Sequence, residues 1–124
     1  MKVVEIVIGT NSYKIEGKKA IPEEIHELIE YALLANEKDP FDPMEIAIKD
    51  LQKRIDKEHI HERKLIKEYP LSNELLAVSH LYSKSKNLYV VGSKGAPEAI
   101  MKLCGSTPKE RKAIEQQVQA LAEQ

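Results

Sequence analysis

Hydrophobic and polar residues alternate with two different periods along this chain. A period of two, typical of strands, runs through residues 3–9 and 12–16, and Thr10-Asn11 is predicted to form the turn between them. After Pro22 the apolar residues recur three or four positions apart, which predicts an amphipathic helix. The apolar positions of this helix are Ile25, Leu28, Ile29, Ala32 and Leu33.

A second helix is predicted to begin after Asp42. Asp42 can accept a backbone hydrogen bond as the N-cap, and Pro43 suits the first helical position because its missing N–H has no partner there. Glu45, at the third position, can fold back onto the Asp42 amide and complete a capping box. The residues predicted to line the buried face are Met44, Ala47, Ile48, Leu51 and Ile55.

The second half of the chain begins with three predicted strands. Residues 65–69 form the first of them, and Pro70 ends it. Residues 75–82 and 87–93 form a hairpin, joined by the polar turn Ser83-Lys84-Ser85-Lys86.

Two further helices are predicted after the strands. A short helix begins at Pro97 and ends at Gly105, with Cys104 as a small buried hydrophobic residue on its face. Thr107-Pro108-Lys109-Glu110 has the pattern of a capping box and starts a last helix. The whole order predicts an α+β fold, a mainly antiparallel sheet flanked by helices.

Length and charge narrow the possible functions. With 124 residues the chain fits one domain, and 19 basic against 20 acidic residues argue against binding through nucleic-acid phosphates. A single cysteine excludes an internal disulfide and every multi-cysteine zinc pattern. His59 and His61 stand two apart but lack a third ligand, so no metal site is predicted.

Lys94 and Gly95 are the candidates for ligand chemistry. They stand where a predicted strand ends and a proline-started helix begins, so the ammonium can meet a phosphate, and a glycine lets a ligand approach the backbone closely. The alternative is a solvated lysine at a strand end, followed by an ordinary turn into a helix.

Four segments in the same order resemble the nucleotide-binding domain of P-type cation-transporting ATPases. Lys94-Gly95-Ala96-Pro97-Glu98 matches the Lys-Gly-Ala-Pro-Glu segment of that family, and Asp42-Pro43-Met44-Glu45 resembles its Asp-Pro-x-Glu stretch. Tyr69-Pro70-Leu71-Ser72, leading into Val78-Ser79, resembles its Pro-Phe-Ser segment and the strand that follows. Residues 114–123 resemble the helix before a strand with a nucleotide-contacting arginine. The residues within these segments are most like those of the bacterial calcium-type branch of the family.

The resemblance implies that residues 1–124 are an ATP-binding domain excised from a longer membrane pump, on the cytoplasmic face of a cell membrane. The bound ATP, with Mg²⁺ in the full-length enzyme, is expected to present its γ-phosphate to an aspartate in a neighbouring phosphorylation domain. The partners expected are that domain and the actuator domain of the same full-length chain. This sequence has no Asp-Lys-Thr-Gly-Thr segment, so it is expected to bind ATP without turning it over.

Position by position, the resemblance implies that a set of seven residues surrounds the nucleotide. Glu45 is expected to accept a hydrogen bond from the adenine amine, and Lys94 to line the adenosine pocket. Leu71 replaces a phenylalanine that stacks on the base in that family, which predicts weak, millimolar binding. The seven residues are Glu45, Leu71, Ser72, Val78, Lys94, Gly95 and Ala96.

A second function class stays open. The chain can instead be a non-catalytic α+β interaction module with a decayed nucleotide pocket, and the missing aromatic ring at Leu71 favours this alternative.

Overall fold

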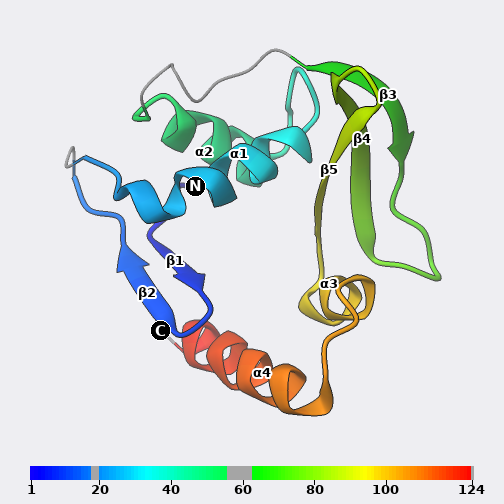
Figure 1. The fold of residues 1–124 in the computed structure, drawn as a ribbon. Helices are drawn as coiled ribbons and strands as arrows, with labels where there is room; N and C mark the ends of the chain where they lie inside the picture. The colour runs from blue at the N-terminus through cyan, green and yellow to red at the C-terminus, as the bar shows by residue number, and fades with distance from the viewer. Residues whose placement is uncertain (18–19, 56–62, 124) are drawn as a thin grey trace.

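The computed structural model describes residues 1–17, 20–55 and 63–123 of the chain. Its elements divide into two antiparallel sheets and the helices around them, an α+β fold as predicted (Figure 1). In chain order they are β1 (Glu5–Ile8), β2 (Asn11–Lys14), η1 (Glu23–Ile25), α1 (His26–Leu34), α2 (Pro43–Gln52), β3 (Lys64–Tyr69), β4 (Ala77–Ser85), β5 (Leu88–Gly95), α3 (Pro97–Leu103) and α4 (Pro108–Ala122).

The first two strands form a separate hairpin. Ile8 pairs with Asn11, so the turn is Gly9-Thr10, one residue earlier than the predicted Thr10-Asn11. Gly9 has a φ of 59°, a left-handed conformation that glycine adopts without a steric penalty. Because glycine is the residue that takes this conformation most readily, the turn lies at Gly9-Thr10.

The three remaining strands form a sheet in the order β3-β4-β5, with both pairs antiparallel. Ser85 pairs with Leu88, so the β4–β5 turn is Lys86-Asn87 and the predicted turn over residues 83–86 is wrong. Asn87 has a φ of 63°, and asparagine is among the residues that tolerate this conformation. The predicted single sheet is therefore two sheets, with α1 and α2 between them (Figure 1).

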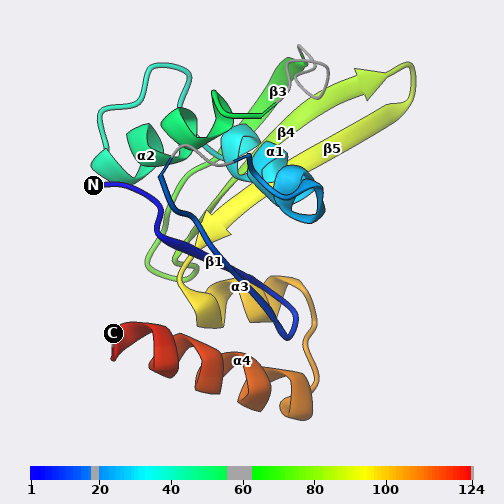
Figure 2. The same ribbon diagram turned by 90° about the vertical axis from the view of Figure 1, so that its left-hand side faces the viewer.

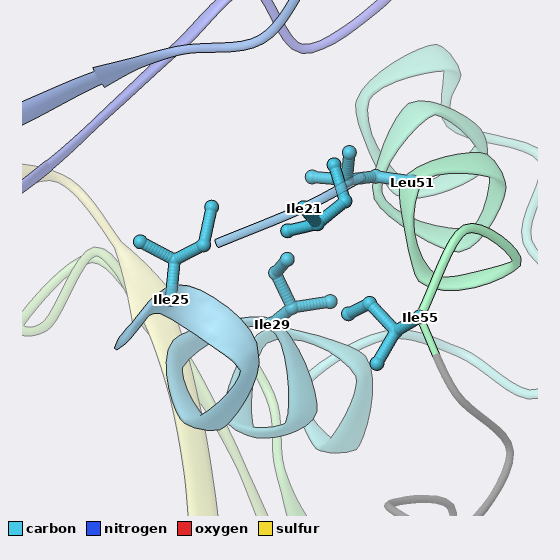
Figure 3. Packing of buried hydrophobic residues seen from close by; sticks show 5 residues of the cluster. All are labelled: Ile21, Ile25, Ile29, Leu51 and Ile55. Carbon is cyan, nitrogen blue, oxygen red and sulfur yellow. The ribbon is translucent and has the colours of Figure 1, made fainter. Parts of the chain in front are cut away.

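The main hydrophobic core joins α1 and α2 to the β1–β2 hairpin. Side chains from η1, α1 and the region around α2 point toward one another (Figure 3), and Val3, Ile6, Ile8, Tyr13 and Ile15 pack against them from the hairpin side. The buried members of the cluster are Ile21, Ile25, Ile29, Leu51 and Ile55.

Two residues predicted to be buried lie outside this core. Leu28 is 42% exposed and Met44 is 56% exposed, although both fit the helical period. The sequence period gives an apolar stripe, but the neighbouring elements decide how much of its width is covered. In this structure the neighbouring elements bury Ile25 and Ile29 but leave Leu28 exposed.

The other face of α1 packs against β5 at Gly92, which is buried. A Cβ built on Gly92 would lie 2.5 Å from the Leu34 Cβ and 2.9 Å from the Tyr31 carbonyl oxygen. Real side chains do not approach so closely, so only glycine allows the helix to sit at this distance from the strand.

The C-terminal helices are held by local caps. Thr107 and Glu110 form the predicted capping box, and Gly105 has a φ of 63° after α3. No residue of α4 is buried, although its Gln117 side chain donates to the Gly9 carbonyl of the hairpin. Both views place α4 beside that hairpin (Figures 1 and 2). Cys104 is exposed, so the prediction of a buried cysteine is wrong, because Cys104 and Leu103 at the end of α3 both face solvent among the described residues.

Candidate functional site

Two residues from separate segments of the sequence meet in an ion pair. The Lys94 ammonium, near the end of β5, binds the Oε1 atom of Glu45, in the first turn of α2. Lys94 also donates to the Asn36 Oδ1 at 3.3 Å, and the Asn36 amide donates to the Glu45 carbonyl at 3.0 Å. We call these three residues the Asn36–Glu45–Lys94 cluster.

The geometry decides between the two roles considered for Glu45. Asp42 alone caps α2, because its Oδ1 accepts from the Met44 N–H at 2.7 Å. The Glu45 carboxylate instead faces Lys94 and lies 3.4 Å from the Glu37 backbone nitrogen. The capping-box alternative is therefore wrong for Glu45.

The two charged side chains differ in their access to solvent. The Glu45 side chain is 8% exposed, whereas that of Lys94 is 27% exposed. A buried carboxylate is stable only with compensating charge and hydrogen bonds, which Lys94 and Glu37 supply. A ligand that arrives from solvent therefore meets the ammonium first, and Glu45 holds that ammonium in place.

Asn36 is the member of this cluster that the sequence did not reveal. It follows the end of α1, where an asparagine usually marks only the end of a helix. Its residue exposure is 6%, and a buried amide in a helix-to-helix connection has to be hydrogen bonded. Only the packing shows that the connection is buried, so no sequence signal could have identified Asn36.

Gly95 and Ala96 have structural partners. A Cβ on Gly95 would overlap the Leu76 carbonyl oxygen and the Ala77 backbone, and the Ala96 N–H donates to that same Leu76 oxygen at 3.0 Å. The chain at Leu76 and Ala77 therefore requires a glycine at position 95, whereas the approach of a ligand there stays a prediction. Val78 pairs with Lys94 across β4 and β5, so it lies beside the cluster.

Leu71 and Ser72 lie in the connection between β3 and β4. Leu71 is 59% exposed, and the Ser72 hydroxyl accepts from the Leu75 N–H at 3.1 Å, which closes this connection on itself. The structure thus joins Glu45 to Lys94, and it places Leu71 and Ser72 in a loop at the same end of the sheet as Lys94.

Two cavities lie near these residues. One of about 450 Å³ is bordered by Asn36, Glu37 and residues of β3 and β4, and does not include Glu45 or Lys94 in its lining. Another of about 430 Å³ lies between the Asn73–Leu76 connection and the C-terminal helices, with Lys102 and Arg111 on its wall. Of the seven predicted residues, neither cavity includes Glu45, Leu71 or Lys94 in its lining.

Comparison with protein-family models, with curated proteins and with solved structures finds no significant match to this chain. Within the described parts of the chain, every helix is too short or too polar to span a bilayer.

Proposed function

We propose that this chain is the ATP-binding domain of a P-type cation-transporting ATPase of the calcium-type branch. The observation that carries the proposal is the pairing of Lys94 with Glu45. They come from two of the segments on which the resemblance rests, and they meet across 49 residues of sequence. If the Lys94 segment were only a turn and the Glu45 segment only a helix cap, there would be no reason for the two side chains to meet.

In the proposed complex, Lys94 is the residue that contacts the nucleotide. Its partly exposed ammonium attracts the phosphate-bearing ligand, and its aliphatic stem provides one wall for the adenosine. Glu45 orients Lys94 and offers its second carboxylate oxygen to the adenine amine. Leu71 supplies an aliphatic surface on the other side, at the same end of the sheet.

The chemistry belongs to the full-length pump. Mg²⁺ accompanies the ATP, and the γ-phosphate is transferred to an aspartate of the phosphorylation domain, which this chain does not contain. The actuator domain and the membrane-bound ion pathway complete that pump at the cytoplasmic face. The 124-residue chain by itself is expected to bind ATP and not to hydrolyse it.

A titration of ¹⁵N-labelled protein with ATP tests this function. We expect fast-exchange shifts at Glu45, Leu71 and Lys94, with a millimolar Kd. Lys94→Met should remove them, whereas Lys86→Met, at the exposed β4–β5 turn, should leave them unchanged. Circular dichroism of each variant confirms that it is folded. An absence of shifts in the native chain at several millimolar ATP would contradict the proposal.

Leu71→Phe is expected to tighten ATP binding at least about fivefold, because a base stacked on an aromatic ring is worth roughly 1–3 kcal/mol. Leu71 is 59% exposed, so the ring can be added without disturbing a core. Leu88→Phe is the matched control, since Leu88 is 57% exposed and lies at the opposite end of the sheet. If Leu71→Phe and Leu88→Phe bound ATP with equal affinity, Leu71 would not belong to the ATP site.

One observation favours the alternative, a non-catalytic interaction module. Lys94 already has the partners Glu45 and Asn36, so the cluster can serve only to join α2 to β5. In that case the ATP titration gives no shifts, while Lys94→Met still lowers the stability of the fold.

A further inference from the structure

A buried histidine next to the Asn36–Glu45–Lys94 cluster has an unused ring nitrogen. His80, in the central strand β4, is 1% exposed, and its Nδ1 lies 2.8 Å from the Leu34 carbonyl oxygen. Its Nε2 is buried without a hydrogen-bond partner. A buried polar atom without a partner costs free energy, so this nitrogen points to a ligand.

The hydrogen bonds of Leu34 fix the state of the ring. A carbonyl oxygen can only accept, so the proton of this bond is on Nδ1 of His80. The Tyr82 hydroxyl donates to the same oxygen at 2.9 Å and occupies its other lone pair. In the neutral ring, Nε2 therefore carries a lone pair, which is the arrangement found in metal-binding histidines.

Two carboxylates face this lone pair. Glu37 Oε1, in the connection between α1 and α2, lies 3.8 Å from Nε2. Glu68 of β3 stands opposite His80 in the register of the sheet. One ligand atom from each of the three residues lies within 4.8 Å of the others.

We propose that Glu37, Glu68 and His80 bind a divalent first-row transition metal ion, with open coordination positions filled by water. An imidazole nitrogen with two carboxylates suits Zn²⁺, Mn²⁺ or Fe²⁺ better than Ca²⁺ or Mg²⁺, which prefer sites made of oxygen alone. Three protein ligands with an open position are typical of a reactive metal centre, whereas structural zinc sites have four.

Small side-chain movements complete the site. Tetrahedral ligands at about 2.0–2.1 Å from a zinc ion are about 3.3 Å from one another. The two glutamates are both exposed, so their carboxylates can close that gap while the buried imidazole stays fixed. The three residues also line the cavity of about 450 Å³, which gives the metal access to water and small ligands.

The electrostatics near Tyr82 agree with a cation site. Burial raises the pKa of Tyr82, and the negative charges of Glu68 and Glu37 raise it further. Lys38, Lys49 and Arg63 also border the cavity, so its wall carries both signs of charge.

The site would join the α1–α2 connection to the neighbouring strands β3 and β4. Glu37 also donates its backbone N–H toward Glu45, so the metal would fix the connection next to the cluster. The inference does not depend on nucleotide binding, because none of its three ligands belongs to the predicted ATP site.

Isothermal titration of the complete chain with Zn²⁺ measures the affinity, and the ¹⁵N chemical shifts of the imidazole show which nitrogen binds. We expect one zinc ion per chain, a large shift of the His80 Nε2 resonance and a retained proton on Nδ1. Glu37→Gln and Glu68→Gln should each weaken binding about 100-fold or more, since loss of an outer-shell partner alone costs 10–100-fold. Both residues are exposed, so these variants test the ligands without removing a core side chain.

Control variants separate this site from other donors in the chain. Glu74→Gln removes an exposed acid outside the site, and His59→Asn/His61→Asn removes two histidines that lie outside the described residues. Both variants should bind zinc like the native chain. Equal affinity in Glu68→Gln, loss of binding in the His59/His61 variant, or a His80 ring protonated on both nitrogens without bound zinc would each overturn the proposal.

Discussion

Gly92→Ala is expected to destabilise the fold by about 3 kcal/mol, the upper part of the range for overpacking a core. The added methyl group would lie 2.5 Å from the Leu34 Cβ and 2.9 Å from the Tyr31 carbonyl oxygen. Neither atom can rotate away, because one is the first carbon of its side chain and the other belongs to the backbone of α1. The helix has to move off β5, and the contacts between α1 and β5 are lost with it.

Urea unfolding followed by circular dichroism measures this loss. Val91→Ala is the control, since Val91 is the next residue of the same strand and is 47% exposed. It should cost well under half as much, because little buried surface is removed. Similar midpoints for Gly92→Ala and the native chain would show that α1 does not pack this closely on β5.

Lys94→Met is expected to cost about 3 kcal/mol, because it leaves the Glu45 carboxylate charged and buried without its partner. Glu45→Gln should cost less. The remaining lysine is 27% exposed and can turn its ammonium toward water, which the carboxylate at 8% exposure cannot do. The structure thus predicts an asymmetry between the two halves of one ion pair.

The double variant Glu45→Gln/Lys94→Met completes the comparison. We expect it to be more stable than Lys94→Met alone, because no unpaired charge remains buried, and the coupling between the two sites should exceed about 1 kcal/mol. Urea unfolding of the four proteins gives this coupling directly. Additive losses, or equal losses for the two single variants, would show that Lys94 and Glu45 are not paired in solution.

Features that depend on near neighbours in sequence were predicted well. Asp42 caps α2 and Thr107 with Glu110 caps α4, because a cap needs only residues within one turn. The helices and strands also lie close to their predicted ranges, although Gly9 and Asn87 placed two turns differently. Both errors arise from the left-handed conformation, which these residues adopt more readily than the flanking ones.

The candidate site was predicted only in part. The sequence identified Lys94 and Glu45 as separate candidates, but it could not show that Glu45 pairs with Lys94 instead of capping its own helix. No sequence pattern pointed to Asn36. None pointed to the group formed by Glu37, Glu68 and His80 either, because these three residues lie in three different segments. Leu71, which the resemblance groups with the site, is exposed in a loop, and its contact with a nucleotide stays a prediction.

Local sequence is enough to predict where the chain becomes helical or extended, and which residues cap those elements, because these choices depend on residues within a few positions. Tertiary structure alone decided which side chains meet. It turned Glu45 from its own helix end toward Lys94, left Met44 and Leu28 in solvent, and buried His80 beside two carboxylates. The reason is physical: burial and charge pairing depend on distances between elements, and the packing of α1 between two sheets sets those distances.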